Sequence, residues 1–132
     1  MERTFVPVES QLFEAIESRS RWNDAVVVGD FVFCTGQIGW DKQTGEFVDG
    51  IEAQTERALE NLKEVLERAG ASLEEVVSMR VYITEHDDYH RYEPVYHRYF
   101  PKDQPARVTI VVADNIHHAL IDFEALAVKR RR

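Results

Sequence analysis

The strongest pattern in the chain is an apolar stripe with helical spacing over residues 51–69. Its apolar members recur every three or four residues, and the positions between them are mainly Glu and Lys. Gly70 follows directly, and glycine is favoured just past a helix end because it adopts a positive φ without strain. We therefore expect an amphipathic helix over residues 51–69, which needs a second layer to pack against.

That second layer is predicted to be a β-sheet. The clearest strand signal is a hairpin, in which Gly29-Asp30 connects the apolar runs 25–28 and 31–35. Residues 11–21 show no pattern that assigns them. Further strands are expected over residues 4–8, 77–84, 106–113 and 119–128.

A second helix is expected after residue 84, with Asp87 or Asp88 as its N-cap. Its apolar side would be formed by Tyr92, Val95, Tyr96 and Tyr99. Pro94 leaves two alternatives, because proline is costly in a helix interior. Either the regular helix begins near Tyr92 with Pro94 in its first turn, or the helix kinks at Pro94.

These elements predict one α+β domain over residues 1–132 in the order β-ββ-α-β-α-ββ. The economical architecture is a mixed six-stranded sheet with both helices packed on one face. The opposite face would then carry apolar side chains that nothing in the chain covers. Because apolar patches of that size are rarely left in water, we expect an oligomer.

The charge of the chain restricts its partners. It carries 16 Lys and Arg against 24 Asp and Glu, a formal net charge of −8, which argues against binding to nucleic acid. Only the basic tail at residues 129–132 points the other way. A single cysteine fits a reducing compartment, and no apolar run resembles a signal peptide or a membrane span, so we expect a cytoplasmic protein.

Cysteine and histidine offer little chemistry. Cys34 lies in an apolar strand, where a free cysteine usually acts as a small hydrophobe. His86 and His90 have the i,i+4 spacing of metal ligands on a helix, and His97 follows. Because there is no HExxH pattern and no supporting cysteine, we expect no metal.

Charged residues inside two of the predicted strands are better candidates. Arg107 falls within an apolar run, where an arginine is costly unless it is paired or near the surface. It is either an exposed residue at the strand end or a clamp for a carboxylate, which the planar guanidinium binds with two hydrogen bonds. Asp122 and Glu124 alternate with apolar residues, so they share one sheet face.

Several segments together resemble one known family. They are the run 29–38 with its Gly-Asp start and Thr-Gly-Gln-Ile end, the loop and helix start at 41–62, Pro105-Ala-Arg107, and the last strand at 121–128. In order and content they are similar to the RidA/YjgF family of reactive intermediate deaminases. The resemblance runs from about residue 29 to residue 129.

The resemblance implies a chorismate-mutase-like fold, a homotrimer with clefts between subunits, and no metal or organic cofactor. It also implies hydrolysis of 2-imino acids and their enamines to 2-keto acids and ammonia. Arg107 stands where the family binds the substrate carboxylate. Asp122 stands where an acid, usually glutamate, orients water. Thr35, just before Gly36, replaces the usual serine of the Ser-Gly-Gln segment and keeps a hydroxyl.

Some positions depart from the family pattern. Trp22 stands near a usual cleft tyrosine, Glu93 at a frequent asparagine and Thr109 at a frequent cysteine. Two other functions therefore stay open. One is a non-catalytic trimeric module that binds small carboxylates or acts as a chaperone-like or regulatory partner. The other is an endoribonuclease or translation inhibitor, against which the net charge argues.

Overall fold

The computed structural model describes residues 1–8 and 22–131, so the whole segment that carries no sequence pattern, residues 11–21, lies outside the described residues. The described strands are β1 (Arg3–Pro7), β2 (Asn23–Val28), β3 (Phe31–Cys34), β4 (Gln37–Ile38), β5 (Val76–Ile83), β6 (Ala106–Val111) and β7 (Ile121–Val128). The α-helices are α2 (Ile51–Arg68) and α3 (Tyr89–Tyr99), and the 3₁₀ turns are η1 (Leu73–Glu75), η2 (His86–Asp88) and η3 (Ile116–His118).

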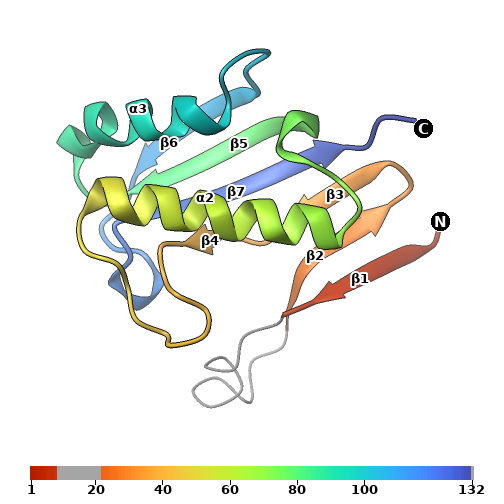
Figure 1. Ribbon diagram of the computed structural model, residues 1–132, viewed down its shortest axis with the longest axis horizontal. Helices are drawn as coiled ribbons and strands as arrows, with labels where there is room; N and C mark the ends of the chain where they lie inside the picture. Colours follow the sequence, from red (N-terminus) through yellow and green to blue (C-terminus); the bar gives the residue numbers. More distant parts are fainter. Residues whose placement is uncertain (9–21, 132) are drawn as a thin grey trace.

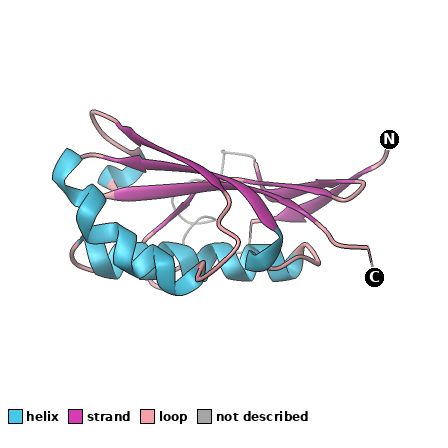
Figure 2. Cartoon of the chain, turned by 90° about the horizontal axis from the view of Figure 1, so that it is seen from above, coloured by secondary structure: helices cyan, strands magenta, loops and turns pink. Residues whose placement is uncertain are grey.

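The strands form one mixed sheet in the order β1-β2-β3-β7-β5-β6, in which only β5 and β6 pair in parallel. Helix α3 makes the crossover between those two strands. Both helices lie on one face of the sheet, so the domain has two layers (Figures 1 and 2). This confirms the predicted α+β class, the mixed sheet and the position of the helices.

The predicted number of strands was wrong. Gln37–Ile38, for which no strand was predicted, pairs with Asp122 and Phe123 of β7 and forms a seventh strand. A two-residue strand has no periodicity of its own, and only the neighbouring strand shows that it pairs. Asn61 of α2 supports the chain here, because its side-chain amide donates to the Ile38 and Trp40 carbonyls at 3.0 Å.

Helix α2 behaves as its sequence predicts. Its buried side, which includes Leu59, Leu62 and Leu66, supplies much of the core beneath the sheet. At its C-terminus Ala71 N–H donates to the Leu66 carbonyl and Gly70 N–H to the Glu67 carbonyl, while Gly70 has φ +81°. This is a Schellman motif, which satisfies carbonyls that the helix end would leave unpaired.

Helix α3 resolves the question that Pro94 raised. The helix begins at Tyr89, directly after Asp88, and continues past Pro94 to Tyr99. The alternative in which the helix begins near Tyr92 is therefore wrong, and Pro94 lies inside the helix. Because turn η2 leads into the helix, Asp88 already has helical φ and ψ and makes no side-chain capping hydrogen bond.

Strand β5 carries one irregularity. Regular alternation back from the buried Met79 would place Val77 on the buried side, but Val77 is exposed and Val76 is buried. A register shift between Val76 and Ser78 causes the exchange, since an extra residue in one strand reverses the side-chain alternation beyond it.

The sheet face away from the helices is open in the single chain. Apolar side chains on this open face are between 37% and 51% exposed: Phe5, Phe31, Phe33, Val108 and Ile110. The predicted uncovered face therefore exists, and the expectation of an oligomer still rests on it. Within the described part of the chain, no helix is both long and apolar enough to cross a membrane.

Candidate active site

Arg107 lies on the second residue of β6 and points toward helix α3. Its guanidinium carbon lies 4.8 Å from the ring centre of Tyr96, 5.6 Å from that of Tyr92 and 5.8 Å from that of Tyr89. Such distances allow cation–π attraction to all three rings. The spacing of these tyrosines along α3 places them on one side of the helix, toward β6.

Polar contacts complete the surroundings of Arg107. Its Nη2 donates to Glu93 Oε2 at 3.2 Å and to the Tyr89 hydroxyl at 3.3 Å. Its Nη1 is buried and has no hydrogen-bond partner among the described residues. A buried donor without a partner costs about 1–3 kcal/mol, so the guanidinium has an unused capacity to bind an acceptor.

A cavity of about 450 Å³ opens beside Arg107. It is lined by Ile83, His86, Tyr89, His90, Arg107, Thr109 and Val111. Thr109 is held in place by a 2.6 Å hydrogen bond between its hydroxyl and that of Tyr92. The cavity therefore combines apolar walls with a fixed positive charge, as small-molecule sites do.

Glu93 is ionised next to Arg107. Burial alone would raise the pKa of Glu93, but hydrogen bonds from Tyr89, Arg107 and His97 hold that pKa below its ordinary value. Burial raises the pKa of the Tyr92 hydroxyl, so this phenol stays neutral. The pair Arg107–Glu93 is thus a charged unit among neutral tyrosines.

The second group of predicted residues lies elsewhere, where β3, β4 and β7 meet. A methyl group on Gly36 would overlap the Asp122 carboxylate, so a side chain at this position would have to displace that carboxylate. Thr35 donates its backbone N–H to the Asp24 carbonyl at 2.9 Å and brings Gly36 to this position. Trp22, which is 44% exposed, directly precedes β2, at the end of the strand that carries Asp24.

Asp122 has an unusual electrostatic environment. Burial, and secondly the negative charge of Glu124, raise its pKa to about 6. Its Oδ1 is buried without a hydrogen-bond partner among the described residues. A carboxyl group with such a pKa can exchange a proton with water near neutral pH.

The two groups of residues lie on opposite faces of the sheet. Arg107 is in register with Met79, which is buried beneath the helices. Asp122 is in register with Tyr82, on the open face, where the Tyr82 hydroxyl donates to Glu124 Oε1 at 2.9 Å. One chain brings Glu93, Arg107 and Thr109 together, but it does not bring them to Asp122, Gly36 and Thr35.

Of the other candidates from the sequence, Cys34 belongs to neither group, whereas His86 and His90 line the cavity beside Arg107. Cys34 is buried, and burial with the nearby charge of Asp24 raises the pKa of its thiol to about 12, so it is a poor nucleophile. No three His, Cys, Asp or Glu side chains within residues 1–8 and 22–131 are arranged to hold a metal ion. His97 instead contacts Glu93, with its Nε2 3.1 Å from Oε2.

Sequence reasoning missed the role of the α3 tyrosines. Tyr92 and Tyr96 were assigned to the apolar side of the helix, which is correct for their burial but not sufficient. Tyr89, Tyr92 and Tyr96 follow one another at intervals of three and four residues, and an arginine lies on the next predicted strand. That combination is the sequence signal that indicates an aromatic enclosure for a cation.

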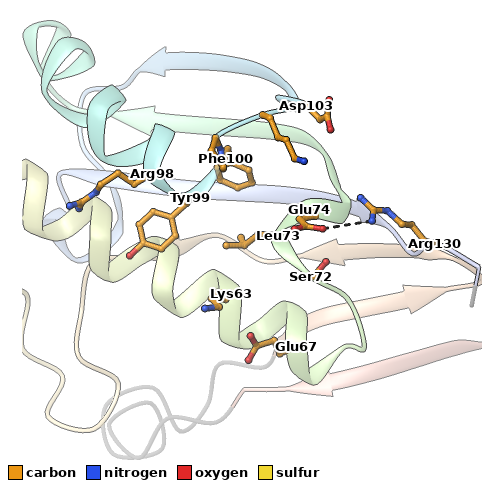
Figure 3. A pocket seen from close by; sticks show the side chains of 12 residues that line it. Lys63, Glu67, Ser72, Leu73, Glu74, Arg98, Tyr99, Phe100, Asp103 and Arg130 are labelled. Carbon is orange, nitrogen blue, oxygen red and sulfur yellow. Dashed lines mark ion pairs between the residues drawn. The ribbon is translucent and has the colours of Figure 1, made fainter.

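A larger cavity of about 650 Å³ lies at the C-terminal ends of α2 and α3, and none of the predicted site residues lines it. Figure 3 shows its lining, in which Arg130 of the basic tail faces Glu74. Arg130 Nη1 lies 3.7 Å from Glu74 Oε2, and Arg131 Nε lies 3.7 Å from Asp30 Oδ2. Arg130 and Arg131 are thus already paired with carboxylates of the chain, which weakens the argument that the tail binds nucleic acid.

Comparison with known proteins identifies the family. The sequence profile of the family described as endoribonuclease L-PSP matches residues 13–129. The chain belongs to this family. The resemblance to RidA/YjgF proteins is thereby confirmed. A RutC family protein of Pyrococcus abyssi is 44% identical over 109 residues, which are 82% of this chain and 86% of that protein.

Two further members of the family carry more specific names. A protein of Dermatophagoides farinae named 2-iminobutanoate/2-iminopropanoate deaminase is 33% identical over 108 residues, 81% of this chain and 84% of that protein. The crystal structure of E. coli TdcF with bound serine matches with a TM-score of 0.81 and 31% identity, covering 84% of this chain and 90% of that one. The fold described above is therefore the fold of the family.

Proposed function

We propose that this protein hydrolyses 2-imino acids to 2-keto acids and ammonia. The observation that carries the proposal is Arg107, a guanidinium enclosed by three tyrosine rings, with an unsatisfied buried Nη1, beside a small cavity. The name of the mite relative supports this reaction, and the serine in TdcF supports a small carboxylate as ligand. Neither a metal nor an organic cofactor is part of the proposal.

In this proposal Arg107 binds the substrate carboxylate. The tyrosine rings fix the guanidinium, so that little side-chain freedom is lost when the substrate binds. Fixing the carboxylate also fixes the adjacent imine carbon, and orientation is the main need of a reaction whose protonated imine is already electrophilic.

Asp122 supplies the proton transfer. Its carboxylate takes a proton from a water molecule as the water oxygen bonds to the imine carbon, which gives a tetrahedral carbinolamine. Asp122 returns this proton to the nitrogen, and its freed carboxylate then takes the hydroxyl proton as the carbon–nitrogen bond breaks. The hydroxyl oxygen becomes the carbonyl of the keto acid, ammonia leaves, and Asp122 passes the second proton to the ammonia, which gives ammonium. A pKa of about 6 suits Asp122 to both directions of transfer.

This chemistry needs two copies of the chain, because Arg107 and Asp122 lie on opposite faces of one sheet. A complete site combines the residues around Arg107 in one subunit with Asp122, Gly36 and Thr35 of another subunit. The apolar open face, on which Asp122 lies, is the surface that an assembly would bury. We propose a homotrimer, with Thr35, Gly36 and Trp22 lining the cleft beside Asp122.

The test is a coupled assay in which an amino-acid oxidase generates 2-iminopropionate and the release of ammonia and keto acid is followed. We expect the wild-type protein to accelerate the release. Arg107→Ala removes the clamp and is expected to lower kcat/KM by on the order of a hundredfold or more, because a substrate that is displaced from its reactive position reacts more slowly.

Arg91→Ala is the matched control. Arg91 lies on α3 close to Glu93 but pairs with Glu52 at 2.9 Å on the surface, so its loss should leave the rate near the wild-type value. Full activity of Arg107→Ala would contradict the assigned clamp. Ligand binding by the wild type without any acceleration would instead favour the non-catalytic carboxylate-binding module.

A further inference from the structure

Glu93 places a negative charge directly beside the proposed carboxylate clamp. Its Oε2 accepts from Arg107 Nη2 at 3.2 Å and lies 3.1 Å from His97 Nε2. The side chains of Arg107 and Glu93 are only 19% and 24% exposed. The tyrosine rings and β6 keep water away from this pair, so its charges act strongly on any ligand nearby.

The pair discriminates between ligands by their charge pattern. A simple carboxylate that approaches Arg107 gains attraction from the guanidinium and meets repulsion from Glu93, whose Oε2 lies 3.2 Å from Arg107 Nη2. A ligand with a carboxylate and a cationic nitrogen is attracted by both residues. Like charges brought together in this way weaken binding, and such a penalty is a common source of specificity.

The dimensions of the pair also suit such a ligand. In a 2-iminium or 2-ammonium acid the nitrogen and the carboxylate carbon are bonded to the same carbon and lie about 2.5 Å apart. Arg107 Nη2 and Glu93 Oε2 lie 3.2 Å apart, a separation of similar size. A ligand carboxylate at the guanidinium therefore brings its nitrogen within reach of the Glu93 carboxylate.

We propose that Glu93 is a specificity-determining residue, which makes the site prefer zwitterionic 2-iminium and 2-ammonium carboxylates over 2-keto acids. The inference rests on the proposed function, since it takes Arg107 as the carboxylate clamp. The Tyr89 hydroxyl and His97 hold the Glu93 carboxylate in position. When hydrolysis removes the nitrogen, the keto acid loses its partner at Glu93, so product leaves more readily than substrate.

A different role for Glu93 would be structural, in which it only neutralises and orients Arg107. The two roles predict different results for Glu93→Gln, which keeps the size of the side chain and removes its charge. A structural role changes the affinity for all carboxylates in the same direction. The specificity role changes it in opposite directions for zwitterions and for simple anions.

The experiment measures dissociation constants by calorimetry for L-alanine, a stable zwitterion, and for pyruvate. The proteins are the wild type, Glu93→Gln, Arg107→Ala and Glu85→Gln. We expect the wild type to prefer alanine. We expect Glu93→Gln to bind alanine more weakly and pyruvate more tightly, so that the ratio of the two constants shifts at least about tenfold toward pyruvate.

Glu85→Gln is the matched control because Glu85 is exposed and lies just ahead of α3, and its replacement changes the net charge equally. Its ratio of constants should equal that of the wild type. An unchanged ratio in Glu93→Gln, or a shift equal to that of Glu85→Gln, would overturn the inference.

The binding assay also separates this inference from the proposed function, because neither ligand turns over. If Arg107→Ala loses both ligands while Glu93→Gln leaves their ratio unchanged, the clamp stands and the role of Glu93 is refuted. If Arg107→Ala binds both ligands as the wild type does, or if the wild type binds neither, the clamp itself fails and the inference fails with it.

Discussion

Asp122 illustrates how a single neighbouring residue sets the properties of a functional group. Gly36 has no side chain, and the carboxyl group of Asp122 occupies the space that a Cβ would fill. The close backbone removes water from the carboxyl group, and Glu124 adds a second negative charge on the same face. Both effects disfavour the ionised form, which explains a pKa well above that of an ordinary aspartate.

This environment predicts the pH dependence of the proposed reaction. Asp122 must be ionised to accept a proton from water, so kcat/KM should rise with increasing pH, with a midpoint at about 6, and fall as pH decreases below it. Glu124→Gln removes the charge that helps to raise the pKa of Asp122, so the midpoint should move to lower pH. The measurement is the rate of ammonia release over pH, corrected for spontaneous hydrolysis.

Asp122→Asn serves as the reference in that series. It should abolish the rise of kcat/KM with pH, called the pH-dependent limb below, together with most of the activity. A midpoint that stays in the same place in Glu124→Gln would show that another group controls the limb. Retention of the limb in Asp122→Asn would exclude Asp122 as the base.

At the scale of the elements, the position where helix α2 ends determines the path of the chain toward the site. Helix α2 stops at Arg68 because Gly70 turns the backbone into the left-handed region and closes the Schellman motif. The stop directs the chain through η1 into β5. Strand β5 then pairs with β7 and β6, and β6 carries Arg107.

Replacement of Gly70 should therefore destabilise the fold measurably. At φ +81° a side chain is strained, and Gly70→Ala is expected to lower the free energy of unfolding by about 1–2 kcal/mol. Gly70→Asn should cost less, because asparagine tolerates this conformation better than alanine. Urea denaturation of the three proteins checks the order, and equal stability of Gly70→Ala and the wild type would contradict the assigned helix stop.

At the scale of the whole molecule, the sheet separates the two halves of the proposed site. The helix face holds Arg107 with Glu93, and the open face holds Asp122. No side-chain rearrangement within one chain brings these faces together, because the sheet itself lies between them. Assembly and activity are therefore expected to be linked.

Complementation between two inactive variants tests this link. Co-expressed Arg107→Ala and Asp122→Asn chains with different tags should form mixed oligomers that regain activity. With random mixing of equal amounts in a closed ring, about one quarter of the interfaces combine an intact Arg107 with an intact Asp122, so about a quarter of wild-type activity is expected. Doubly purified mixed oligomers that are no more active than either variant alone would contradict a shared site.

Much of this protein is determined by its sequence alone, because local patterns report local physics. The apolar period of residues 51–68 and the glycine after them defined helix α2 to within one residue. The hairpin at Gly29-Asp30 and the alternation in β7 were equally clear. The family segments by themselves identify Arg107 and Asp122 as candidate site residues.

Tertiary structure decided what depends on register and on pairing between distant segments. The pairing of β4 with β7, the bulge in β5 and the path of α3 through Pro94 have no local signature. Only the packed chain shows that Glu93 reaches Arg107 and that Asp122 faces the other way. The physical reason is that periodicity determines which side of its own element a residue occupies, whereas contacts between elements are determined by how those elements pack together.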